Sequence, residues 1–312
     1  MPSHPAGLGA PPRATITARV RDILRAAPVT EVYRAALASA LALPGNVLSD
    51  TADARWAHLV WVCCQAAGGH PEDAAPTAAA VELFMVALDV LDDAEDGEET
   101  ALHASLGSAR SLNVSTGLLL LAQCSLLALP AGPMLTGILL DAGMHACAGQ
   151  HADLAPAAEH GHDLDAALDV AAGKSASLVA ALCRMGVACA GVDRDVQERY
   201  ACFGQLLGMA LQLENDIAAV RPGASGKTDV TLGRPTLPLA CATYLDATAE
   251  ASTVADRRSP STEAAALVAW TVAETYRRRA VEMVPALCGG PAGRSALMSL
   301  LRWGVYDPGA RA

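Results

Sequence analysis

A run of apolar residues that ends in a dense acidic cluster constrains this chain more than any other feature. Residues 78–88 contain a single charged side chain, and Asp92, Asp93 and Asp96 follow about one turn later. Residues four apart share a face of an α-helix, so Asp92 and Asp96 project together with Asp93 beside them. These like charges repel one another. Hard divalent cations such as Mg²⁺, which prefer carboxylate oxygens, would compensate them, and the alternative is a solvated acidic helix end.

The rest of the sequence predicts an all-α fold. Alanine is abundant throughout, β-branched runs are scarce and no strand–turn–strand pattern occurs. With 312 residues, 52% of them hydrophobic, the chain can bury a sizeable core. We expect one catalytic domain over residues 15–306, built of roughly ten to twelve helices. Residues 1–14 and 307–312 are expected to be flexible tails, and the first of them lacks the apolar core of a signal peptide.

Charge and cysteine content exclude several classes of function. The net charge of −11 argues against general affinity for nucleic acid or anionic membranes. Nine cysteines without a CxxC pair favour reduced core thiols over disulfides or a zinc site, which indicates a reducing cytoplasm. The apolar stretch at residues 118–129 is too short to cross a bilayer. We therefore expect a soluble, cytoplasmic protein without a membrane span.

A second polar cluster interrupts another apolar run, at residues 207–220. Gln212 and Asp216 are four apart and should face the same way on a helix. Basic residues accompany this cluster in the sequence: Lys174 begins an apolar segment upstream, and Lys227 and Arg234 follow downstream. Two polar turns with bound metal, together with these cations, would form a cage for a highly charged anion.

The order and spacing of these segments resemble the trans-polyprenyl diphosphate synthase (isoprenoid synthase) family, from about residue 59 to residue 242. The resemblance is carried by residues 66–74 with Glu82, the DDxxD of residues 92–96, Gly149-Gln150 with Asp153, Lys174-Ser175, residues 212–216, Lys227, Asp229 and Thr236-Leu237-Pro238. It implies a bundle of helices around a deep apolar cavity, and a homodimer. It also implies an enzyme that binds an allylic prenyl diphosphate through about three Mg²⁺ ions.

The same resemblance assigns roles to individual residues. Asp92, Asp93, Asp96 and Asp216 would be catalytic, and the metal ligands would be Asp92, Asp96, Asn215 and Asp216. Lys174 and Lys227 would contact the diphosphate of the substrate, with Gln212 and Gln150 supporting. Arg234 is added to this substrate-binding set on its positive charge alone. In the family, metal and lysine charge stabilise the departing pyrophosphate and leave an allylic carbocation in a dry pocket.

Departures from the family pattern decide which activity we expect. Chain-elongating members carry a basic GGKRLRP segment where residues 53–57 contain only Arg55. They also carry an arginine pair where this chain has Glu98 and Glu99. Those basic groups hold isopentenyl diphosphate, and glutamates there would repel it. We therefore expect a class I terpene synthase that ionises a prenyl diphosphate but lacks the isopentenyl diphosphate site.

Two alternatives stay open at this point. The chain can be a prenyltransferase that uses another acceptor, such as a peptide or a small molecule. It can also be a catalytically silent partner subunit of a true prenyl diphosphate synthase, although the retained aspartates and lysines argue against that. The basic run at residues 277–279 is interpreted as a solvated helix face, and the alternative is that it caps the active site.

The residues before the acidic cluster bear on the length of the substrate. In the family, bulky residues four and five positions before the first aspartate close the floor of the pocket, and here these are Leu88 and Ala87. Phe84 lies one turn further, about 12 Å along the helix from the acidic cluster. We expect Phe84 to form the floor for a C20 (or C15) diphosphate.

Overall fold

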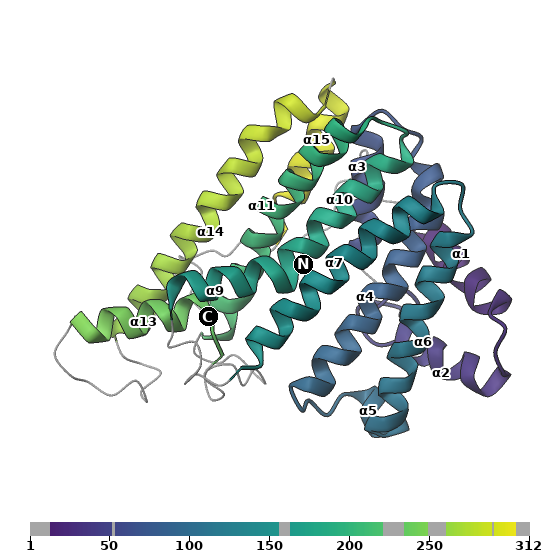
Figure 1. Cartoon of the computed structure of the whole chain (residues 1–312), viewed down its shortest axis with the longest axis horizontal. Coiled ribbons are helices and arrows are strands. Elements are labelled where there is room, and N and C mark those ends of the chain that lie inside the picture. Colours follow the sequence, from purple (N-terminus) through teal and green to yellow (C-terminus); the bar gives the residue numbers. More distant parts are fainter. Residues whose placement is uncertain are drawn as a thin grey trace. The chain divides into compact units, whose positions relative to one another are not determined.

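Every regular element in the described part of the chain is a helix, which confirms the predicted all-α fold class (Figure 1). The computed structural model describes residues 13–51, 54–155, 163–220, 234–248, 260–288 and 290–303. The elements are α1 (Arg13–Ala26), α2 (Glu31–Leu41), α3 (Arg55–Ala66), the 3₁₀ turn η1 (Pro71–Ala74), α4 (Ala75–Glu95), α5 (Ala101–Leu106), α6 (Ser108–Leu127), α7 (Gly132–Asp153), α9 (Leu164–Ala171), the π-helical turn η2 (Ala172–Ala176), α10 (Ser177–Cys189), α11 (Arg194–Ala219), α13 (Leu237–Thr248), α14 (Pro260–Leu287) and α15 (Pro291–Leu300).

The chain divides into two compact units. The first unit comprises the described parts of Met1–Leu139, Leu182–Glu198 and Leu287–Leu297. The second comprises those of Leu140–Ala181, Arg199–Ala286 and Met298–Ala312. The predicted boundaries of a catalytic domain at residues 15–306 stay a prediction.

Helix α4 is the centre of the first unit. It packs against α1, α2, α3 and α6, and Figure 1 shows α4 and α6 side by side. A helix that is apolar all round belongs in a core, and α4 is buried from Thr77 to Ala87. Its one charged residue in this stretch, Glu82, is 3% exposed and accepts a hydrogen bond from the Ala57 backbone N–H at 2.7 Å. Glu82 thus caps the start of α3, where Ala54 provides no side-chain cap.

Several of the nine cysteines are small side chains buried between closely packed helices. Five are buried, whereas Cys124, Cys147 and Cys202 are exposed, which corrects the expectation that such residues fill the core generally. All nine are free thiols, as expected. Burial and a hydrogen bond with Cys183 raise the pKa of Cys63 well above its ordinary value, so this thiol is inert core material.

The second unit is built on small side chains. Its core includes Leu213 and Ile217 of α11 together with Ala265, Ala269 and Ala273 of α14. Alanines spaced by four residues lie on one face of a helix and let a neighbouring helix approach closely. This core holds α11, which carries the second polar cluster.

Two helical stretches among the described residues are long and apolar enough to cross a membrane. They are Glu72–Glu95, 78% of whose most apolar segment is buried within the protein, and Leu164–Cys189, 50% of which is buried. Core helices of soluble proteins also pass this test of length and composition. The expected absence of a membrane span therefore stays a prediction.

Candidate functional site

The first acidic cluster lies at the carboxyl end of α4. The helix ends at Glu95, but the Asp96 backbone N–H still bonds to the Asp92 carbonyl at 2.9 Å. Helical geometry therefore continues through Asp96, and Asp92 and Asp96 stand one turn apart as the spacing predicts. Asp92, Asp93 and Asp96 are each partly exposed. Their roles in catalysis and metal binding stay predictions.

Two carboxyl groups have raised pKa values: Asp93 of this cluster and Asp89, which lies just before it on α4. The pKa of Asp89 rises to about 7, mainly because protein atoms crowd the carboxyl and reduce its hydration, and then because Asp92 and Asp93 lie nearby. Arg55 acts in the opposite direction. Asp89 nevertheless has an exposed surface, so one side of the carboxyl meets solvent. The pKa of Asp93 is also raised, first by partial burial and then by Glu98 and other nearby carboxylates, with His103 opposing.

A set of carboxylates that disfavour one another's charge fits the chemistry of a divalent cation site. Among the described residues, no group of three or more His, Cys, Asp or Glu side chains is gathered closely enough to hold an ion as it stands. Neighbouring carboxylates disfavour one another's charge, and a bound cation would offset that repulsion. The residue types fit Mg²⁺.

The loop after the cluster is short and acidic. Gly97 has a φ of 71°, a left-handed conformation that glycine adopts without strain, and it ends α4. Thr100 then caps α5, its hydroxyl accepting from the His103 backbone N–H at 3.3 Å. Glu98 and Glu99 are exposed between these two residues. The loop therefore presents two solvated glutamates, and the charge of Glu98 raises the pKa of Asp93.

The predicted pocket-floor residues lie in the interior of the first unit. Phe84 is 3% exposed and Ala87 is fully buried, while Leu88 is partly exposed. The Ser115 hydroxyl of α6 donates to the Ala87 carbonyl at 2.8 Å, which ties α6 to α4 at this level. The predicted contact of Phe84, Ala87 and Leu88 with a prenyl chain stays a prediction.

In the second unit, Lys174 forms an ion pair with Asp153. Its ammonium lies 2.9 Å from Asp153 of α7, and the Asp153 carbonyl accepts from the buried Arg234 side chain at 3.1 Å. Lys174 sits in the π-helical turn η2, and π-turns are frequent at functional sites. A Cβ added to Gly149 would lie 2.2 Å from the Lys174 backbone nitrogen, so only glycine permits this approach of α7 to η2. Gln150, the next residue, is partly buried.

A chain of hydrogen bonds joins η2 to the second polar cluster. The Ser175 hydroxyl donates to the Gln212 side-chain oxygen, and the Gln212 amide donates to Asp216 at 2.8 Å. The predicted common face of Gln212 and Asp216 is thereby confirmed. Asp216 is 7% exposed, whereas its neighbour Asn215 is exposed to solvent. Lys227 lies outside the described residues.

Sequence reasoning missed a buried ion pair behind this cluster. Arg277 of α14 is 7% exposed, so its interpretation as part of a solvated face is wrong. Its guanidinium lies 2.5 Å from Glu214 of α11, which is equally buried. The signal was available in the sequence, because Arg277 continues the four-residue spacing of Ala265, Ala269 and Ala273. Arg278, one residue on, is exposed as predicted.

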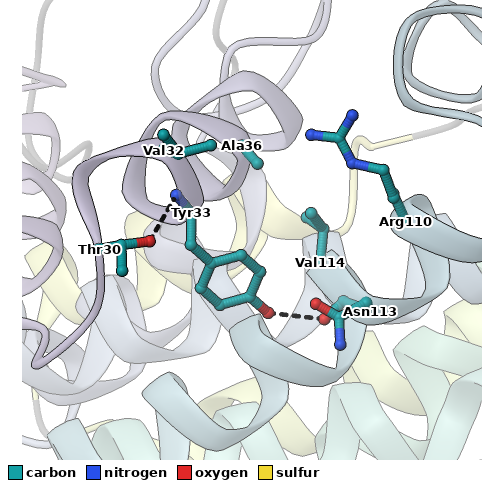
Figure 2. A pocket seen from close by; sticks show the side chains of 7 residues that line it. All are labelled: Thr30, Val32, Tyr33, Ala36, Arg110, Asn113 and Val114. Carbon is teal, nitrogen blue, oxygen red and sulfur yellow. Dashed lines mark hydrogen bonds between the residues drawn. The ribbon is translucent and has the colours of Figure 1, made fainter.

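A surface hollow of about 120 Å³ lies elsewhere in the first unit, between α2 and α6 (Figure 2). Tyr33 lies across it and donates its hydroxyl hydrogen to the Asn113 carbonyl at 2.8 Å. Arg110 supplies the only charge in its lining. None of the predicted site residues lines this hollow.

The fold matches known structures of isoprenoid synthases. A polyprenyl synthetase from Streptomyces coelicolor A3(2) superposes with a TM-score of 0.77 at 22% identity, over 94% of this chain and 97% of that one. A polyprenyl synthase from Caulobacter crescentus CB15, crystallised with calcium and isoprenyl diphosphate, gives a TM-score of 0.74 at 24% identity, over 96% and 98% of the two chains. At these identities the likeness establishes the fold, which is the all-helical isoprenoid synthase fold.

The sequence establishes the family. The polyprenyl synthetase family model matches residues 53–274, and the chain therefore belongs to that family. It is 34% identical over 194 residues to the (2E,6E)-farnesyl diphosphate synthase of Mycobacterium tuberculosis, covering 58% of this chain and 54% of the relative. It is 30% identical over 223 residues to the geranylgeranyl diphosphate synthase of the same species, covering 63% and 59%. The chain thus spans little more than half the length of these curated relatives.

Proposed function

We propose that this protein is an Mg²⁺-dependent class I terpene synthase that ionises a C20 (or C15) allylic prenyl diphosphate. The observation that carries the proposal is the acidic loop directly after the first cluster. Glu98 lies close enough to Asp93 to raise its pKa, in the region where an elongating enzyme needs positive charge. A negative field there opposes binding of a second diphosphate. The carbocation would then react with its own double bonds or with water.

The donor set supports a metal-dependent ionisation. Asp92, Asp96, Asn215 and Asp216 would hold about three Mg²⁺ ions. When bound, the ions would neutralise charge on the departing pyrophosphate. The Caulobacter crescentus relative, whose structure is described as complexed with calcium and isoprenyl diphosphate, supports a divalent cation and a prenyl diphosphate here.

The chain's own cations have a defined part in this proposal. Lys174 would contact the diphosphate, since its ammonium is a positive charge that the ion pair with Asp153 holds in the second unit, beside the segment that bonds to Gln212. Asp153 would hold that ammonium in place. Arg234, which fixes the Asp153 backbone, and Gln212, which orients Asp216, would support the two sides of the same pyrophosphate. The C–O bond would break with its electron pair leaving on pyrophosphate, where the positive charges of Lys174 and Arg234 would stabilise it.

Chain elongation is the second candidate. The mycobacterial relatives are named as farnesyl and geranylgeranyl diphosphate synthases, which favours it. Arg55 also persists at the start of α3 and acts on Asp89, so one positive group stays near the first cluster. An enzyme of this kind would add isopentenyl diphosphate to an allylic diphosphate.

Product analysis separates the two candidates. The purified protein is incubated with geranylgeranyl and farnesyl diphosphates and Mg²⁺, with and without isopentenyl diphosphate. The proposed function gives hydrocarbons or terpene alcohols without isopentenyl diphosphate, detected by gas chromatography and mass spectrometry. A longer prenyl diphosphate, formed only when isopentenyl diphosphate is present, would instead establish elongation.

A matched pair of variants tests the acidic loop itself. Glu98→Arg/Glu99→Arg should enable some elongation, because it replaces the negative field with a positive one. Glu72→Arg changes an exposed glutamate on η1 and serves as the control, with products unchanged. If the double variant elongates no better than the control, the acidic loop does not decide the activity.

The exposed apolar residues of α6 support the proposed homodimer. Leu112, Leu120 and Leu127 are 40%, 58% and 54% exposed, and their spacing places them within one broad face of the helix. Arg110 is the only charged residue in α6. A second copy of the chain would bury this uncharged face.

We also propose that the protein acts in the cytoplasm, without binding nucleic acid.

A further inference from the structure

We propose that Arg277 is a positioning residue for the second polar cluster. It holds α11 from the side opposite Gln212 and Asp216 and so fixes the rotation of the helix that presents them. This inference rests on the proposed function, in which Asp216 and Asn215 bind metal. Arg277 itself touches neither metal nor substrate.

The contacts of Arg277 join three segments of the second unit. Its Nη2 lies 2.5 Å from Glu214 on α11, and its Nε lies 3.7 Å from Glu274 on its own helix α14. Its Nη1 donates to the Leu301 carbonyl and, at 3.4 Å, to the Trp303 carbonyl, both beyond the end of α15. A guanidinium can serve such a set because its donors are fixed in a planar fork.

The helix geometry places Glu214 behind the polar cluster. Each residue turns an α-helix by about 100°, so Glu214 lies about 200° from both Gln212 and Asp216. The contacts agree, since Gln212 bonds to Ser175 of η2 while Glu214 bonds to Arg277 of α14. Helix α11 is therefore held by polar contacts on two opposite sides at the level of the cluster.

The apolar contacts of α11 near the polar cluster are made in part with small side chains. Leu213 and Ile217 share a core with Ala265, Ala269 and Ala273 of α14, and larger side chains such as Trp270 pack against the same core. A buried ion pair is directional and opposes rotation of the helix, because a displaced Glu214 would be a buried charge without its partner. The pair therefore adds a directional contact to this apolar packing, directly behind Gln212 and Asp216.

The test replaces the ion pair by apolar residues of similar size, in Glu214→Met/Arg277→Met. Such replacements of buried pairs leave stability near that of the parent, but the Leu301 and Trp303 carbonyls lose a donor here, so the double variant should fold with a Tm a few degrees below that of the parent. The Mg²⁺ concentration for half-maximal pyrophosphate release should rise about 10-fold, the usual cost of losing an indirect support of a metal site. The rise in Tm produced by Mg²⁺ with inorganic pyrophosphate should shrink in parallel.

Arg278→Met is the matched control. Arg278 lies on the same helix and pairs with Glu274 at 3.1 Å, but its side chain is 76% exposed. Its loss should change neither the Mg²⁺ requirement nor the Tm response. Arg277→Lys keeps the charge without the fork and should raise the Mg²⁺ requirement by a smaller factor; it carries the test if the double variant does not fold.

The outcomes separate this inference from the proposed function. A folded double variant with the wild-type Mg²⁺ requirement and the wild-type Tm response would show that the pair is only structural, which overturns the inference alone. A wild-type protein whose Tm does not respond to Mg²⁺ with pyrophosphate, and which releases none from any prenyl diphosphate, overturns the proposed function and this inference with it.

Discussion

The two polar clusters of this molecule are built in opposite ways. At the end of α4, Asp89 and Asp93 have raised pKa values because crowding and neighbouring carboxylates disfavour their charge. Around α11, by contrast, Gln212 links Ser175 to Asp216 through side-chain hydrogen bonds. The first cluster concentrates negative charge, whereas the second orders its polar groups through the protein itself.

The difference indicates what each cluster needs from a ligand. Cations added to the first cluster would relieve repulsion, so binding there should stabilise the fold directly. In the second cluster the protein's own hydrogen bonds already hold the polar side chains. This cluster should therefore contribute to catalysis by orienting the bound ligand. Substitutions in either cluster should therefore reduce activity, but their effects on stability should differ between the two clusters.

The largest expected effect is the loss of turnover in Asp92→Ala and in Asp216→Ala. Each should lower pyrophosphate release by about 10³-fold or more, because each would remove a ligand of the Mg²⁺ ions that would stabilise the departing pyrophosphate. A coupled pyrophosphate assay with geranylgeranyl diphosphate measures it, with circular dichroism to check the helical fold.

Stability in a chelator then separates the two variants. Asp92→Ala should hold or raise the Tm, since it relieves like-charge repulsion. Asp216→Ala should lower stability by about 1 kcal/mol, because it removes the acceptor for the Gln212 amide. Equal destabilisation by both changes would contradict the contrast between the clusters.

A smaller loss is expected from Asp153→Asn in the second unit. The change keeps the size of the side chain but removes the charge that holds Lys174 at 2.9 Å. Turnover should fall about 10- to 100-fold, as for other groups that orient a functional side chain. The KM for the prenyl diphosphate should rise as well, since Lys174 would contact that substrate. Asp141→Asn, an exposed position on the same helix α7, is the control and should leave both parameters unchanged.

Local spacing predicted much of this arrangement. The apolar run before Asp92 predicted a buried helix with an acidic end, and the spacing of Gln212 and Asp216 predicted their contact. Both predictions depend on residues within one or two turns of a single helix, where geometry follows directly from sequence. The all-α fold class followed from composition in the same way.

Contacts between distant residues escaped prediction. Glu214 and Arg277 are 63 residues apart, and nothing in the run at residues 277–279 shows which arginine turns inward until the alanine face of α14 is considered. The π-helical turn that carries Lys174 was also not predicted, nor was the close packing of Gly149 against it. These features depend on how helices meet, which local patterns do not specify.

The smallest effect concerns Asp89 and tests the electrostatics of the first cluster most directly. Its pKa is about 7 in the folded protein, above the ordinary value of 3.8. Between these two pH values the folded state binds more protons than the unfolded state, so Asp89 lowers stability as the pH rises from about 4 to 7, and the full penalty is present above pH 7. Asp89→Asn removes that penalty.

In a chelator at pH 8, Asp89→Asn should therefore be more stable than the parent. Because Asp89 is exposed, solvent screening limits the gain to about 1 kcal/mol, or a Tm rise of about 2 to 4 °C. At pH 4 the gain should vanish, and Mg²⁺ should reduce it at pH 8 by stabilising the ionised carboxylates of the parent. Thermal melts at both pH values measure this. A gain of the same size at pH 4 and pH 8 would show that the carboxylate charge of Asp89 is not its cause, and the first cluster would then not be the charge-strained region inferred here.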